Sequence, residues 1–348
     1  MSSLPMIKNY EDLVAFNNYL LESSCSLNIE SVSIVNNFIV INGETFNLDN
    51  FIYNYVISAS NHLKGNIYRL KKYDFSKLIL RTHPDIFMEE YLRPFINNIV
   101  MMGESEFKLW NFIIKLENHE IILKALNNVN VEEVFIPYFI TSISERVFGF
   151  HNTIKKVHIQ DGSKLKKIGD LAFSDCRKLT EINLPEGLET IGECAFEWSG
   201  LKEIVIPSSV TLIKKKAFKN CVYLANVIIK KDSKLEIIGD ASFHSCKRLK
   251  SISSIPDSVK EVGKCAFSHC NRLRSIVLGR GIKFIPKDFV RVCYALTSVI
   301  IKGDIEGVEK DAFRGVPIEE IEIPNTSPLI TNADLCNKKR YGVKFYFN

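Results

Sequence analysis

The sequence predicts an α/β-type repeat solenoid with one parallel sheet, preceded by a small α+β region. The first observation is a phenylalanine that recurs every 22 to 25 residues through the C-terminal two-thirds of the chain. A fixed period of this length is typical of solenoids, in which each repeat buries its apolar face against the next. The recurring positions are Phe148, Phe173, Phe196, Phe218, Phe243, Phe267, Phe289 and Phe313.

The second observation is a short alternating segment that opens each unit. In residues 179–184 the apolar Ile182 and Leu184 alternate with polar residues, which predicts a strand with one buried side. Pro185 follows and ends the pairing. A second block, Ile-Gly-x-x-Ala-Phe at residues 191–196, predicts the return segment that carries the core phenylalanine.

Together these blocks give the consensus L-x-x-I-x-I-P-x-x-V-x-x-I-G-x-x-A-F-x-x-C-x-x-L. This pattern resembles the BspA-like class of leucine-rich repeat proteins, which are found on bacterial surfaces and in protozoa. The resemblance covers residues 131–324, with eight full units and a partial ninth. It implies a leucine-rich repeat solenoid that binds other proteins.

We divide the chain into three parts. Residues 129–324 form the solenoid, and residues 325–348 form a C-terminal cap in which residues 341–347 supply a closing strand. One unit carries an extra residue at Ser253-Ser254, which predicts a bulge.

Residues 1–128 do not repeat and resemble no family, and we expect them to cap the first repeat. Within this part, residues 31–48 predict short strands broken at Asn36-Asn37 and Asn42-Gly43. Apolar spacing and capping residues predict helices elsewhere in it, over residues 9–23, 51–63, 84–90 and 118–126.

Composition and charge limit the classes of function. The chain carries a net charge of +5, and residues 129–348 hold 34 Lys and Arg against 26 Asp and Glu. This excess is too small to predict nucleic-acid binding by itself. The N-terminus does not read as a secretory signal, and no apolar run reaches the ~18 residues of a membrane span. We therefore expect a cytoplasmic protein with free cysteines, and cell-surface adhesion to host or matrix proteins is the alternative that the family resemblance implies.

Cysteines recur at fixed repeat positions and raise the question of a metal site. Two interpretations are open: metal binding assisted by His244 and His269, or a ladder of buried small thiols. The ladder is favoured because no C-x-x-C pair has a partner pair. The positions are Cys176, Cys221, Cys246 and Cys270 in one column and Cys194 and Cys265 in another.

No arrangement of nucleophile, base and acid stands out in the sequence. We therefore predict a protein with no catalytic residues, no cofactor and no metal, whose partner is another protein. The sequence identifies neither that partner nor the oligomeric state.

The outward positions of the predicted strands give the candidate partner site. Apolar residues recur at the second outward position, which suggests an exposed column on the sheet. Two alternatives to partner binding stay open: branched residues suit strands whatever they face, or the front region folds over this side. The predicted partner-binding residues are Glu181, Glu203, Val205, Ile228, Val277 and Ile300.

Basic residues also recur beside the strands, at Lys202, Lys250 and Arg274. They could bind nucleic acid or anionic lipid, or they could be a solvated edge that keeps the protein soluble. The solvated edge is favoured because aromatic residues are not interleaved with the basic ones in the sequence pattern.

Overall fold

The computed structural model describes residues 32–35, 38–41, 44–47, 106–109, 112–118, 120–126, 131–324 and 344–347, and it divides into two units, Met1–Glu104 and Ser105–Asn348. In the first unit, β1 (Val32–Val35), β2 (Phe38–Ile41) and β3 (Glu44–Asn47) form an antiparallel sheet. The predicted breaks at residues 36–37 and 42–43 are confirmed, because they separate these strands. The helices predicted over residues 9–23, 51–63 and 84–90 lie outside the described residues.

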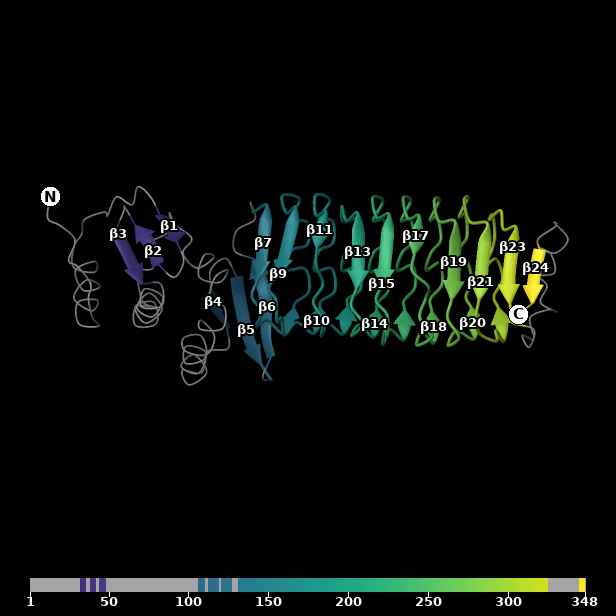
Figure 1. Ribbon diagram of the computed structural model, residues 1–348, viewed down its shortest axis with the longest axis horizontal. Helices are drawn as coiled ribbons and strands as arrows, with labels where there is room; N and C mark the ends of the chain where they lie inside the picture. The colour runs from purple at the N-terminus through teal and green to yellow at the C-terminus, as the bar shows by residue number, and fades with distance from the viewer. Residues whose placement is uncertain are drawn as a thin grey trace. The chain divides into compact units, whose positions relative to one another are not determined.

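The second unit contains a solenoid of about nine turns, and each turn between residues 131 and 324 begins with a strand of the first column (Figure 1). These strands pair in parallel within three sheets, β7-β9-β11, β13-β15-β17 and β19-β21-β23. The predicted closing strand is confirmed, because β24 (Lys344–Phe347) pairs with β23. The first column comprises β7 (Glu133–Ile136), β9 (Lys156–Ile159), β11 (Glu181–Ile182), β13 (Glu203–Ile206), β15 (Asn226–Ile229), β17 (Ser251–Ile252), β19 (Ser275–Leu278), β21 (Ser298–Ile301) and β23 (Glu320–Ile323).

A second column of two-residue strands runs along the return side of the turns. The prediction of one parallel sheet is therefore wrong. A strand of two residues is too short to show an alternating pattern in the sequence. These strands form because equivalent segments of successive turns pair with each other. They are β8 (Ser142–Ile143), β10 (Lys167–Ile168), β12 (Thr190–Ile191), β14 (Leu212–Ile213), β16 (Ile237–Ile238), β18 (Glu261–Val262), β20 (Phe284–Ile285) and β22 (Gly307–Val308).

Three antiparallel strands end the second column on its N-terminal side. They are β4 (Glu106–Leu109), β5 (Phe112–Glu117) and β6 (Glu120–Leu126), and β6 also pairs in parallel with β8. The helix predicted over residues 118–126 is therefore wrong, because hydrogen bonding to a strand on each side outweighs local helix propensity. The repeat-containing unit begins at Ser105, earlier than the predicted boundary at residue 129.

The return segments are tight turns, and no α-helix occurs among the described residues. Each segment contains two residues with positive φ four positions apart, for example Cys194 (52°) and Trp198 (61°). The amide of Cys194 donates to the carbonyl oxygen of Lys215 at 3.0 Å, in the next turn. Alternate amides of the return segment therefore bond to the next turn, whereas those between them bond within the segment, as the amide of Ala195 does to the carbonyl oxygen of Gly192 at 3.3 Å.

A stack of phenylalanine rings fills the core. From Phe148 to Phe267 neighbouring ring centroids lie 4.8 to 5.3 Å apart and the rings are nearly parallel, with interplanar angles of 3 to 8°. Phe289 ends this arrangement with an edge-on contact at 88°. All eight recurring phenylalanines are buried, which confirms them as the core. Truncating one to alanine removes contacts worth about 3–5 kcal/mol.

The extra residue at Ser253-Ser254 interrupts the first column. Strand β17 ends at Ile252, and the Ser253 hydroxyl accepts a hydrogen bond from the amide of Ile229 at 2.7 Å. A side chain thus takes the place of a backbone carbonyl, and the sheet that starts at β13 stops at β17.

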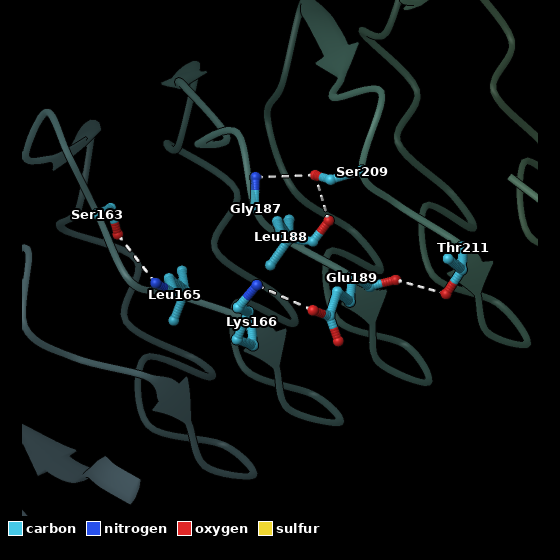
Figure 2. A network of polar contacts seen from close by, with 8 residues as sticks. All are labelled: Ser163, Leu165, Lys166, Gly187, Leu188, Glu189, Ser209 and Thr211. Atoms are coloured by element: carbon cyan, nitrogen blue, oxygen red, sulfur yellow. Dashed lines mark hydrogen bonds and ion pairs between the residues drawn. The ribbon is translucent and has the colours of Figure 1, made fainter. Parts of the chain in front are cut away.

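Polar contacts also join the segments between the two columns from one turn to the next (Figure 2). The amide of Gly187 donates to the Ser209 hydroxyl at 2.9 Å, which in turn donates to the carbonyl oxygen of Leu188 at 2.7 Å. Lys166 and Glu189 form an ion pair at 2.9 Å. Adjacent turns are therefore held at a fixed separation along this edge as well.

The glycine of the Ile-Gly motif allows this separation. A Cβ added to Gly192 would lie 2.5 Å from the carbonyl carbon and oxygen of Gly169, in the preceding turn. No side-chain movement relieves a clash with backbone, so the glycine is required by the approach of two turns.

We predict that Gly192→Ala lowers the free energy of unfolding by about 1–3 kcal/mol, as overpacking does elsewhere. Lys214→Ala is the matched control, because Lys214 occupies the same repeat position and already carries a Cβ. Urea unfolding followed by circular dichroism measures both. Equal midpoints for the two variants would contradict a steric role for the glycine.

Candidate partner-binding surfaces

The outward side of the first-column strands, called the sheet face below, carries all six predicted partner-binding residues. Ile228 is 41% exposed. Glu181 and Glu203 are also exposed, and Val205, Val277 and Ile300 are half-buried. The alternation within each strand buries the flanking residues, such as Ile204 and Ile206 beside Val205.

The register places the apolar residues in two pairs. Val205 lies directly opposite Ile228 on neighbouring strands, and Val277 lies opposite Ile300. The extra residue after β17 separates the two pairs, because the sheet of β13 and β15 ends there and a new sheet begins at β19. The expected continuous column is thus two apolar patches on separate sheets.

Polar side chains border the first patch. Asn226 donates from Nδ2 to Glu203 Oε2 at 3.1 Å, and the Ser251 hydroxyl donates to Asn226 Oδ1 at 3.1 Å. These contacts link three successive turns along one row. Each of these contacts is exposed to solvent.

An ion pair joins Lys156 of β9 and Glu181 of β11, with Nζ and Oε2 2.9 Å apart. The hydrogen bond and the charge of each partner raise the pKa of Lys156 and lower the pKa of Glu181. Both groups therefore stay charged over the whole neutral range of pH.

The sheet face also holds an aromatic contact that was not among the predicted site residues. The rings of Phe135 and His158 stack with centroids 4.5 Å apart, and His158 Nε2 lies 3.2 Å from Glu133 Oε2. Both rings occupy the second outward position of their strands and lie directly opposite each other in the register of β7 and β9.

The cysteine column lies inside the solenoid. Each Sγ donates to the carbonyl oxygen of a core phenylalanine in the preceding turn, at 2.9 Å from Cys176 to Phe148 and 3.0 Å from Cys221 to Phe196. Burial raises the pKa of both thiols to about 12. The same contact is made by Cys246, Cys270 and Cys293.

Nothing in the described part of the chain brings three or more His, Cys, Asp or Glu side chains together as a metal site. His244 and His269 contact each other edge-on with centroids 5.1 Å apart, and burial lowers the pKa of His244. The thiols are used as hydrogen-bond donors to the backbone, which is the role of a structural ladder.

The predicted basic residues lie on the edge where return segments turn into first-column strands. Lys202, Lys250 and Arg274 are exposed there. Backbone hydrogen bonds between successive turns run through this edge. The amide of Ala225 donates to the carbonyl oxygen of Lys202, and the amide of Lys250 donates to the carbonyl oxygen of Ala225. Tyr223 and Tyr294 are exposed on the same edge, so the expectation that aromatic residues are not interleaved with the basic ones is wrong.

Among the described residues, no helix has the length and apolar character to cross a membrane.

Comparison with known proteins identifies the repeat. The family described as BspA type leucine-rich repeat region, six copies, matches residues 104–225 and 221–339. No curated protein matches the chain.

Several solved structures similar to the chain are leucine-rich repeat proteins of bacteria. A leucine-rich repeat protein of T. pallidum shares 22% identity with a TM-score of 0.43, over 70% of this chain and 98% of its own. A leucine-rich cell surface protein of Faecalibacterium prausnitzii shares 22% identity with a TM-score of 0.29, over 64% of this chain and 89% of its own. A leucine-rich repeat protein of Bacteroides ovatus shares 20% identity with a TM-score of 0.30, over 70% of this chain and 99% of its own.

We predict that the five ladder cysteines resist alkylation in the folded protein at pH 8, because the thiolate is the reactive form and burial disfavours it. Unfolding returns the thiols to an ordinary pKa and exposes them, so all five then react. Mass spectrometry after iodoacetamide treatment, with and without guanidinium, measures this. The internal comparison is Cys265, which is only half-buried and is expected to react first. Labelling of Cys221 or Cys246 before Cys265 in the folded protein would contradict the interpretation of the column as a ladder of buried thiols.

Proposed function

Because the chain belongs to the family of BspA-type leucine-rich repeat proteins, we propose that its solenoid is a non-catalytic scaffold that binds a protein partner on the sheet face. Leucine-rich repeat domains are generally protein-interaction modules. The observation that carries the proposal is the apolar pair of Val205 and Ile228, which lies at the solvent surface of a hydrogen-bonded sheet.

The surroundings of this pair support binding. A small apolar centre with a polar border is the arrangement in which partner side chains lose contact with water and contribute most to affinity. Glu203, Asn226 and Ser251 form that border through their hydrogen bonds. The polar row can align a partner by hydrogen bonding, and the apolar pair can contribute the buried area.

The backbone beneath the pair is already ordered before any partner arrives. Strands β13 and β15 pair over four residues each, and the core phenylalanines of adjacent turns, Phe196 and Phe218, stack on each other with centroids 5.2 Å apart. A rigid surface loses little conformational entropy on binding, which favours affinity. The second pair, Val277 and Ile300, has the same setting on strands β19 and β21.

The first test is an affinity pull-down from the source cell with Val205→Glu/Ile228→Lys and Val277→Glu/Ile300→Lys. Each double substitution places opposite charges on directly opposed residues, which favours the fold while removing the apolar surface. We expect at least one protein retained by the wild-type chain to be lost from one of these variants.

The matched control is Leu212→Glu/Ile237→Lys, because these half-buried residues are also directly opposed but lie in the second column. Circular dichroism verifies that every variant is folded. A partner list that is identical for the wild-type chain and both sheet-face variants would contradict the proposed site.

We further propose that the protein works in a reducing compartment of the cell. The seven cysteines described by the structure are all free, and five of them are S–H donors within the core. Free thiols are typical of proteins kept in reducing surroundings. We expect intact source cells treated with a membrane-impermeant biotin reagent to leave the protein unlabelled, and lysed cells to label it. Labelling of intact cells would favour the alternative, a surface adhesion protein.

A further inference from the structure

From the fourth to the eighth turn, the edge where return segments enter the first-column strands is strongly basic, whereas in the first two turns of the same edge Lys155 pairs with Glu132 at 2.8 Å. We call residues 199–202, 222–225, 247–250, 271–274 and 294–297 the basic edge. These turns contain no Asp or Glu. Their cations are all exposed: Lys202, Lys247, Arg248, Lys250, Arg272 and Arg274.

The opposite edge, where the first-column strands lead into the second column, is different. There, exposed cations pair with carboxylates of other turns: Lys166 with Glu189 at 2.9 Å and Lys260 with Glu236 at 3.2 Å in adjacent turns, and Lys230 with Glu186 at 2.5 Å two turns away. Within the described part of the chain, no cation of the basic edge makes such a pair, and the residues of the edge itself include no carboxylate. The positive charge of the basic edge is therefore not neutralised by its own repeats.

Repetition aligns these charges. Turns that pair as parallel strands repeat at ~4.8 Å, so residues at equivalent positions form rows along the solenoid. Lys202, Ala225 and Lys250 follow one another in the backbone ladder. Lys202 and Lys250 are therefore two steps apart in this row, with the uncharged Ala225 between them. Like charges in such a row repel one another, and together they attract an extended anionic chain more strongly than a single ion.

An aromatic ring holds one cation of the basic edge, Arg248, in place. The Arg248 guanidinium carbon lies 5.1 Å from the centroid of the Tyr223 ring, in the preceding turn. A guanidinium fixed on a ring has lost part of its side-chain freedom and presents its N–H groups in the plane that pairs with a carboxylate. Tyr223 is thus a positioning residue for Arg248.

We propose that the basic edge binds an acidic segment of the protein partner. This inference rests on the proposed function, because Lys202, Lys250 and Arg274 immediately precede the outward residues Glu203, Ser251 and Ser275 of the sheet face. A partner that covers Val205 and Ile228 therefore reaches the edge as well.

A protein segment fits better than nucleic acid. An exposed carboxylate, Glu203, lies one residue row inside the edge on the sheet face, next to Lys202. It repels a continuous phosphate backbone that crosses from the edge to the sheet, whereas a protein can place its acidic residues on the edge and other residues on the sheet.

The test is fluorescence anisotropy of a fluorescein-labelled decaglutamate peptide added to the full chain. The edge variant is Arg248→Gln/Lys250→Gln/Arg272→Gln/Arg274→Gln. The control is Lys166→Gln/Lys230→Gln/Lys260→Gln/Arg280→Gln, which removes the same charge from the opposite edge, between the two columns. We expect binding that weakens as salt is raised, a loss on the order of tenfold in the edge variant, and little change in the control.

Two single variants test the positioning role of Tyr223. Tyr223→Ala is expected to weaken peptide binding severalfold, and Tyr223→Phe is expected to retain it, because the ring and not the hydroxyl holds Arg248. Equal losses in the two variants would contradict that role.

Several outcomes overturn the proposal. One is no binding of the peptide by the wild-type chain, and another is an equal loss in the edge and control variants, which would mean attraction by net charge alone. A third is tighter binding of an oligothymidylate of equal charge, which would mean a nucleic-acid site. The variant Val205→Glu/Ile228→Lys is expected to bind the peptide as the wild-type chain does, so failure of the sheet-face site is distinguished from failure of the edge.

Discussion

The hydrogen-bond ladder between successive turns is the constraint on which the rest of the solenoid depends. Each turn must lie one strand spacing from the next, along the first column, the second column and the tight return segments at once. Gly169 and Gly192 meet backbone to backbone for this reason, and Cys194 and Trp198 take up positive φ so that their amides reach the following turn. The parallel stack of phenylalanines follows, because rings at equivalent positions are brought to about the same spacing.

The same spacing decides what each column of side chains can do. A buried column of small thiols becomes a row of donors to the phenylalanine carbonyl oxygens, as at Cys176 and Cys221, so residues often associated with chemistry have a structural use here. Burial raises the thiol pKa, which makes these cysteines poor nucleophiles and poor metal ligands.

On the surface, a column stabilises the protein only where neighbouring turns supply complementary groups. Lys166 and Glu189 do so on the edge between the two columns, and Glu203, Asn226 and Ser251 do so on the sheet face. On the basic edge, Lys202, Lys250 and Arg274 make no ion pair with the residues that the structure describes. The charges that the repeats leave unpaired, and the apolar pairs that they leave at the surface, are the features available to a partner.

The sequence by itself determined the period of the repeat, the buried phenylalanines, and the outward position of Val205, Ile228, Val277 and Ile300, because these follow from patterns within one repeat. The features that arise from contacts between repeats were decided only by the tertiary structure. The second column of strands, the pairing of residues 120–126 with β8, and the division of the apolar column at Ser253 arise from hydrogen bonds between turns. The stacking of Arg248 on Tyr223 likewise joins residues 25 positions apart. No local pattern contains that information, because the partners of each group lie one turn away along the axis of the solenoid.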